Sequence, residues 1–137
     1  MSGNKYGYDA WWKIAEKDLE AAEFLLHAPS KLGFAVGFHA QQAAEKYLKS
    51  YLVSQAVSPD RTHHLRRLLK ECVAFEPALA ALKPECDVLF PFAVDPRYPN
   101  LLVEPDAEVC KTLISAAKKI RAAVRQVLPK PRNGRDR

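Results

Sequence analysis

The stretch from Phe34 to Val53 carries the widest apolar arc in the chain. Placed on a helix at about 100° per residue, its apolar side chains cover more than half of the circumference. A helix with so wide an arc must be covered on several sides, so the pattern predicts the central member of a helical bundle. The narrow stripe that remains holds polar side chains: His39, Gln42, Lys46, Lys49 and Ser50.

Gln41 and Glu45, one helical turn apart, interrupt this apolar arc. An amide and a carboxylate among apolar side chains are costly unless they are hydrogen-bonded. We therefore predict that both are buried and hydrogen-bonded, with Arg97 as the preferred partner of Glu45. They form either a structural bond to a neighbouring helix or the polar floor of a binding cleft.

A first helix is predicted from Asp9, as its N-cap, to about His27. Phe24 stands alone on the polar side of that helix. The turn at residues 29–33 is short, so the first two helices should be antiparallel.

Thr62 is a good N-cap for a third helix, with His63 and His64 in its first turn. The segment 78–90 is helix-prone but is broken by Pro84, which predicts two short helices or one irregular helix.

Glu104 and Pro105 open the last predicted helix, with proline at its first position, and Pro129 ends it. No segment alternates with period two. The expected fold is therefore an all-α, up-and-down bundle of four principal helices plus a short additional helix. Its last helix has a regular apolar stripe: Cys110, Leu113, Ile114, Ala117, Ile120, Val124 and Val127.

Length and composition indicate one globular domain. A chain of 137 residues can bury one core, and no apolar run approaches the roughly 18 residues that span a bilayer. No signal peptide precedes Trp11, so we expect a cytoplasmic protein. The three cysteines lack metal-site spacing and are expected to be reduced and mostly buried.

The net charge of +5 is concentrated at the C-terminus. The segment 129–137 contributes +3, which leaves only +2 for residues 1–128. We interpret residues 1–128 as the helical domain and 129–137 as a basic, disordered tail. An electrostatic arm for RNA or an acidic partner is the alternative reading of the tail.

Phosphate-binding loops require closely spaced glycines, and none of the five glycines is so arranged. His63 and His64 are adjacent, without a cysteine or acid at ligand spacing, so we expect no metal and no cofactor.

Four segments resemble the HEPN family, small helical domains named for a suspected nucleotide-binding role. They occur in the order that the resemblance implies and extend over most of the chain, roughly from Tyr8 to Leu128. The segments are W-x2-A-x2-D-L-x2-A-x3-L from Trp12 to Leu26, AQQAAEKYLKSYL from Ala40 to Leu52, Thr62-His63-x-Leu65, and Arg97-Tyr98-Pro99.

The activity most associated with the wider family is RNA cleavage by an Arg followed, after four to six residues, by a His. Such a pair could activate the ribose 2′-OH and stabilise the phosphate in the transition state. Here the first arginine is Arg61 and the last histidine is His64, so no such spacing exists. We carry over no nuclease activity and assign no catalytic residue.

A cationic group remains as the candidate binding site. Residues 61–70 hold four Arg or Lys side chains and two histidines, without an acid. Arg offers a planar fork for phosphate or carboxylate, and Tyr offers an aromatic face. A solvated basic face, with Arg97 paired to Glu45, is the alternative. The predicted ligand-binding residues are Gln41, Glu45, Lys46, Lys49, His63, Arg97 and Tyr98.

The resulting hypothesis is a non-catalytic HEPN module that binds a nucleotide or another anion. The resemblance implies a separately encoded minimal nucleotidyltransferase as partner, in a two-component, toxin–antitoxin-like system. The alternatives are an RNA-directed nuclease with an atypical active site and a pure protein-interaction domain. We also expect a homodimer, from the family's habit of pairing and from Phe24, Tyr47 and Tyr51.

Overall fold

The computed structural model describes residues 7–59, 61–62, 64–93 and 103–129, and within them the chain is helical, with no strand. None of these helices is long and apolar enough to cross a membrane. In chain order the elements are α1 (Tyr8–Leu26), α2 (Gly33–Ser54), α3 (Leu65–Phe75), the 3₁₀ segment η1 (Pro77–Leu82), α4 (Lys83–Leu89), the 3₁₀ segment η2 (Phe90–Phe92) and α5 (Ala107–Val127).

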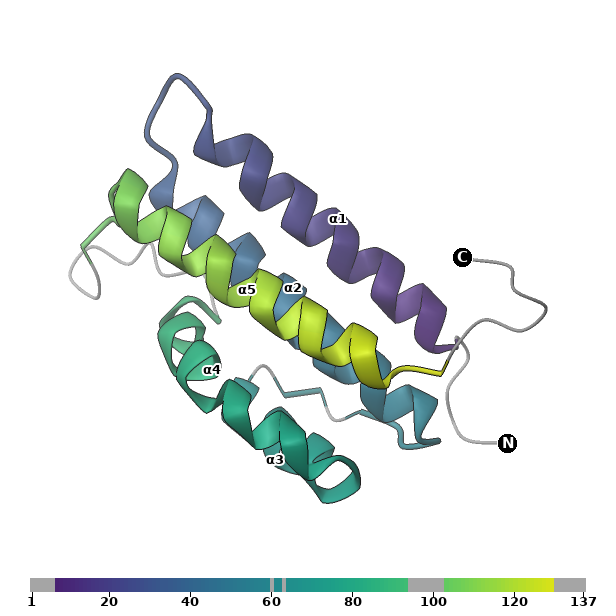
Figure 1. Ribbon diagram of the computed structural model, residues 1–137. Helices are drawn as coiled ribbons and strands as arrows, with labels where there is room; N and C mark the ends of the chain where they lie inside the picture. Colours follow the sequence, from purple (N-terminus) through teal and green to yellow (C-terminus); the bar gives the residue numbers. More distant parts are fainter. Residues whose placement is uncertain (1–6, 60, 63, 94–102, 130–137) are drawn as a thin grey trace.

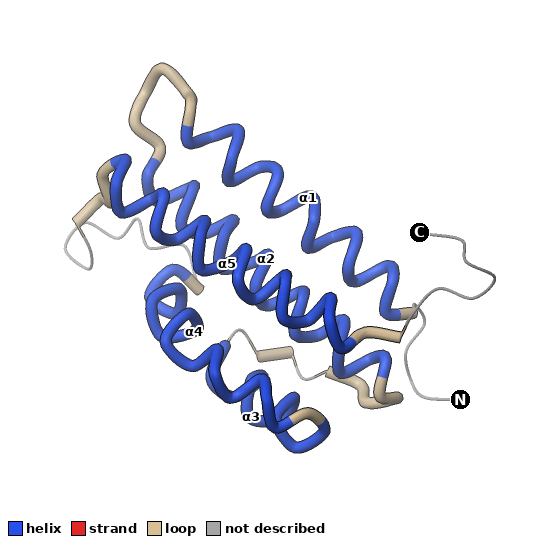
Figure 2. The backbone as a smooth tube through the Cα atoms, viewed as in Figure 1, coloured by secondary structure: helices blue, strands red, loops and turns tan. Residues whose placement is uncertain are grey.

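Three long helices lie side by side, and a shorter layer packs across them (Figure 1). α2 runs antiparallel to α1 and packs mainly against it, while α5 packs against α2 and, less extensively, against α1. The shorter layer consists of α3, η1 and α4, where α3 contacts α2 and α4 contacts α5. The tube in Figure 2 shows that the described connections between helices are short. The predicted all-α bundle with a short additional piece is confirmed.

α2 is the central helix, as its apolar arc predicts. Fourteen of its 22 residues are buried, compared with three of the 19 residues of α1. Two members of the polar stripe, Lys49 and Ser50, are buried, at 5% and 0% exposure. Ser50 Oγ donates to the carbonyl of Tyr8 at 2.8 Å, so the start of α1 covers this side of α2.

Two predicted N-caps are incorrect. Asp9 lies inside the first turn of α1, and the cap position is Gly7. α3 begins at Leu65 with His64 as its N-cap residue. The Thr62 hydroxyl instead accepts a hydrogen bond from the His64 backbone N–H at 3.0 Å, so it stabilises the turn before the helix.

α5 begins two residues later than the proline rule predicts. Asp106 is the N-cap, and its side chain accepts a hydrogen bond from the Val109 backbone N–H at 2.9 Å. A capping carboxylate satisfies a free N–H and favours the positive helix end, so it outweighs proline as the start signal. The apolar stripe of α5 is buried from Cys110 to Val124, as expected.

Gly37 permits a close contact between α2 and η2. A Cβ atom at this position would lie 2.5 Å from Cδ1 of the Phe92 ring. Phe92 is buried against α2, so the absence of a side chain at Gly37 brings the end of the shorter layer onto the central helix.

Candidate functional site

The polar residues of α2 form a continuous ladder along one side of the helix. Gln42 Nε2 donates to Gln41 Oε1 at 2.7 Å, and Gln41 Nε2 donates to Glu45 Oε1 at 3.3 Å. Lys49 Nζ pairs with Glu45 Oε2 at 2.9 Å, and Lys46 Nζ donates to Gln42 Oε1 at 2.7 Å. A spacing of four residues brings three of these pairs together, while Gln41 and Gln42 are adjacent in the sequence. We call Gln41, Gln42, Glu45, Lys46 and Lys49 the α2 polar ladder.

The ladder resolves the energetic problem of Gln41 and Glu45. They are 0% and 1% exposed, and both are hydrogen-bonded, which confirms the expectation of buried and bonded side chains. Lys49 lies under the Trp11 ring, with Nζ 5.7 Å from the ring centroid. Its charge is therefore held between a carboxylate and an aromatic face.

The ladder has most of its charge satisfied internally. Lys46 is only 16% exposed and lies 3.8 Å from Glu45 Oε2, while Lys49 is buried. Ligand binding by Gln41, Glu45, Lys46 and Lys49 stays a prediction. The other predicted ligands, His63, Arg97 and Tyr98, and therefore the expected Arg97–Glu45 pair, lie outside the described residues.

A second polar cluster joins α1, α2 and α5. The Tyr47 hydroxyl donates to Glu16 Oε1 at 2.5 Å, and Arg121 donates to both oxygens of Glu16, at 2.6 Å from Nε and 3.1 Å from Nη2. Trp12 covers it, with its ring 4.7 Å from that of Tyr47 and 5.6 Å from Arg121 Cζ. The Arg121 hydrogen bond lowers the pKa of Glu16, and burial together with Glu16 raises the pKa of Tyr47.

Sequence reasoning missed this cluster because Glu16 and Arg121 are 105 residues apart. The one available signal was the hydroxyl of Tyr47 inside an apolar arc, which needs a partner. Tyr47 and Tyr51 are buried within the chain, at 0% and 3% exposure, so they cannot supply the subunit contact expected of them. Phe24 is 77% exposed.

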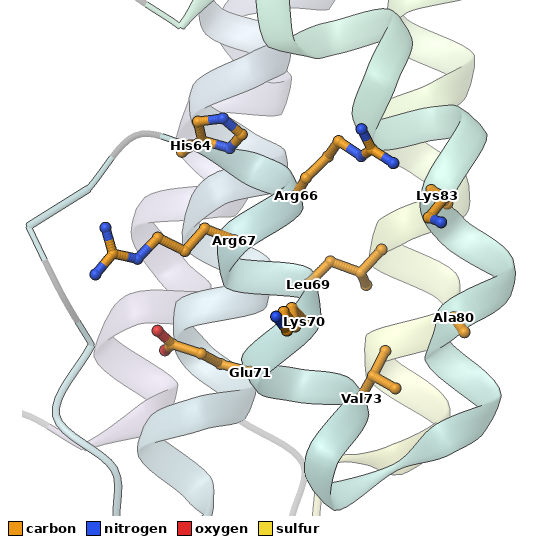
Figure 3. A pocket seen from close by; sticks show the side chains of 9 residues that line it. All are labelled: His64, Arg66, Arg67, Leu69, Lys70, Glu71, Val73, Ala80 and Lys83. Atoms are coloured by element: carbon orange, nitrogen blue, oxygen red, sulfur yellow. The ribbon is translucent and has the colours of Figure 1, made fainter.

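A groove with a cationic rim runs between α3 and the η1–α4 segment, with a volume of about 800 Å³. Figure 3 shows Leu69 and Val73 pointing across the groove towards Ala80 and Lys83. We call it the α3 groove; its lining residues are His64, Arg66, Arg67, Leu69, Lys70, Glu71, Val73, Ala80 and Lys83.

Basic side chains dominate the rim of the α3 groove. Arg66, Arg67, Lys70 and Lys83 are all exposed. Among the acids nearby, Asp87 lies 3.1 Å from Arg66 Nε, with both side chains half exposed. The second acid, Glu71, points to the same side of α3 as Arg67 and away from the groove floor (Figure 3). This arrangement can attract phosphate or carboxylate groups.

No group of metal-ligating side chains occurs in the part of the chain that the structure describes. The three cysteines are buried free thiols, and burial raises the pKa of Cys72 and of Cys86 to about 12. These thiols are therefore protonated at neutral pH and act as core side chains.

Comparisons with known proteins agree with the segments identified in the sequence. A family model for the HEPN domain matches residues 8–127. The crystal structure of an archaeal HEPN homologue is similar to this chain at 25% identity, with a TM-score of 0.70, over 88% of this chain and 97% of that chain. A search of curated proteins found no match.

Proposed function

Because this chain belongs to the HEPN domain family, we propose that it is a non-catalytic binding module that recognises nucleotides or other anions. We further propose that it works beside a separately encoded minimal nucleotidyltransferase, in a two-component, toxin–antitoxin-like system. The single observation that carries the binding proposal is the cationic surface of α3.

The cations of α3 are more exposed to solvent than Lys49 of α2. Lys49 is buried against Glu45, whereas Lys70 is exposed along the rim of a groove and Arg66 remains half exposed beside Asp87. Exposed Arg and Lys side chains in a concave surface raise the local concentration of anions. We therefore place phosphate recognition on α3.

The absence of an Arg-x4-6-His pair supports the non-catalytic part of the proposal. RNA cleavage depends on such a pair because one group moves the 2′-OH proton and the other stabilises the negative charge on the phosphate oxygens.

We would test this by titrating ATP and a short RNA into the wild type and the Arg66→Ala/Lys70→Ala variant. We expect at least tenfold weaker binding in the variant, and weaker binding by wild type as salt rises, because salt screens exposed charges. Lys111→Ala/Arg125→Ala removes the same charge from exposed positions on α5 and should change binding by less than twofold.

Two results would contradict the proposal. Loss of binding only in a chain ending at Leu128 would move the site to the basic tail. Metal-independent RNA cleavage by wild type, abolished by His63→Ala, would make the protein a nuclease. The partner half is tested by gene neighbourhood, followed by co-purification with the product of any adjacent nucleotidyltransferase gene.

A further inference from the structure

Four residues of α3 share the helix face that forms the groove. Arg66, Leu69, Lys70 and Val73 are spaced at i, i+3, i+4 and i+7, so they lie within one face about 100° wide. The core face of α3 carries Leu65, Leu68, Leu69 and Cys72, all of which are buried, and Val73 packs against this core. The groove therefore opens at the edge of the core, where Leu69 and Val73 border the charged side chains Arg66 and Lys70.

The floor of the α3 groove is aliphatic. Leu69 is 4% exposed, Val73 is half-buried, and Ala80 of η1 is exposed across the groove. Figure 3 shows the two α3 side chains directed into the space between the helical segments. A phosphate gains nothing from such a floor, whereas an apolar side chain does.

Positively charged side chains line both sides of the groove floor. Arg66 and Lys70 lie on α3, and Lys83 begins α4 on the opposite side. Asp87 is matched by Arg66, so the rim keeps a cationic excess. An aliphatic floor with a cationic rim on each side is complementary to a helix that has an apolar stripe flanked by acidic side chains.

We propose that the α3 groove docks an acidic amphipathic helix of a partner protein. This goes beyond the proposed function, because the ligand is a protein segment and the floor supplies the affinity. α3 has 11 residues, about 16 Å, which matches two to three turns of a docked helix.

Charge excludes two other possible occupants of the α3 groove: the chain's own C-terminal segment and a second copy of the chain. The chain's own segment 129–137 carries +3 and would be repelled by the rim. A second copy that paired through the same groove would place two cationic rims against each other. A nucleotide or RNA can use the cationic rim, as the proposed function requires, but it has no aliphatic side chains to fill the floor, since bases stack on aromatic rings.

The test uses a synthetic 18-residue peptide with leucines at i, i+3, i+4 and i+7 and glutamates elsewhere. A peptide with the same composition but no apolar face is its control. Fluorescence anisotropy measures binding to the full chain. We expect the amphipathic peptide to bind at least tenfold more tightly than its control, because only it fills the floor.

Two variants at Val73 separate the floor from the charge. Val73→Glu and Val73→Lys should each weaken peptide binding at least tenfold, although Val73→Lys adds a cation. The same changes at Val109, an exposed valine of α5, should alter binding by less than twofold. Circular dichroism checks that each variant is folded. If Val73→Glu or Val73→Lys is unfolded, Val73→Ser replaces it.

Three results would overturn the inference: equal binding of both peptides, tighter peptide binding by Val73→Lys, or loss of short-RNA binding in both Val73 variants while the peptide stays bound. The last result would show that RNA occupies the floor of the groove as well as its rim. ATP titration into Val73→Lys is a separate measurement. An ATP affinity equal to that of the wild type supports different modes of binding for ATP and for the peptide. Absence of ATP binding in wild type contradicts the proposed function but leaves the docking inference standing.

Discussion

At the scale of single residues, two carboxylates of the long helices are each held by fixed partners. Glu45 is 1% exposed and pairs with Lys49 at 2.9 Å, while Glu16, which is 37% exposed, takes three hydrogen bonds from Tyr47 and Arg121. Removing one member of a buried pair such as Glu45–Lys49 typically costs about 3–5 kcal/mol, because the other charge stays buried. The Glu16 cluster joins α1, α2 and α5, so it helps to specify how the long helices align.

Glu16 should make stability depend on acid. Its pKa is lowered in the folded state, chiefly by the Arg121 hydrogen bond, from an ordinary value of 4.5. The stabilisation is then present above pH 4.5 and is lost as the pH falls through the folded-state pKa. Glu16 is 37% exposed, so water screens the pair and we expect about 1 kcal/mol.

Urea unfolding of the wild type and Glu16→Gln at pH 7, 5 and 3.5 measures this difference. The two proteins should differ at pH 7 and 5, and the difference should shrink as the pH is lowered to 3.5. Glu20→Gln, at an exposed position on the same helix, should follow the wild type at every pH. A gap between wild type and Glu16→Gln that stays constant with pH would contradict the assignment.

At the scale of elements, the shorter layer is positioned by close contact with α2. Phe92 of η2 packs over Gly37, and the Cys72 thiol of α3 lies 3.5 Å from the carbonyl of Leu48. Without a Cβ at Gly37, the ring reaches the helix backbone. This contact fixes where α3 and α4 lie, and so where the α3 groove opens.

Gly37→Ala should destabilise the protein despite improving helix propensity. Alanine gains about 1 kcal/mol within a helix, but overpacking costs about 1–3 kcal/mol, and here the new Cβ would meet the Phe92 ring at 2.5 Å. We expect a net loss of about 1 kcal/mol in the free energy of unfolding. In a Phe92→Leu background the same change should become neutral or stabilising. An equal cost in both backgrounds would mean that the ring is not the obstacle.

At the scale of the whole molecule, the surface is divided between an aromatic position on α1 and the cationic groove on the shorter layer. Phe24 of α1 is 77% exposed. The groove lies in the shorter layer formed by α3, η1 and α4. The exposed aromatic side chain and the groove therefore belong to different parts of the fold.

We propose that the chain forms a homodimer through the exposed side of α1. Light scattering at tens of micromolar should give about twice the chain mass of 15.4 kDa. Phe24→Ser should weaken the dimer at least tenfold, because it removes the largest exposed apolar side chain of α1. Phe75→Ser, at the end of α3, is the matched control. A mass near that of one chain at every concentration would contradict the homodimer.

Much of the fold could be predicted because helix formation is local. The apolar arc of α2, the stripe of α5 and the burial of Gln41 and Glu45 follow from a repeat of about 3.6 residues. The order of HEPN-like segments likewise identified the family that the family model and the archaeal structure support. Helix starts were harder to predict. Thr62 stabilises the turn at His64 instead of capping α3, and Asp106 caps α5 two residues after the start that Pro105 indicates.

Only the tertiary structure decided which polar groups are neutralised and which remain available. Lys49 belongs to the polar stripe of its own helix, but α1 covers it and Glu45 pairs with it. The Glu16–Arg121 pair joins residues that no local period connects. The α3 groove depends on α3 and η1–α4 packing side by side. The sequence determines each helix through local hydrogen bonds, whereas burial and charge pairing depend on neighbours distant in the chain.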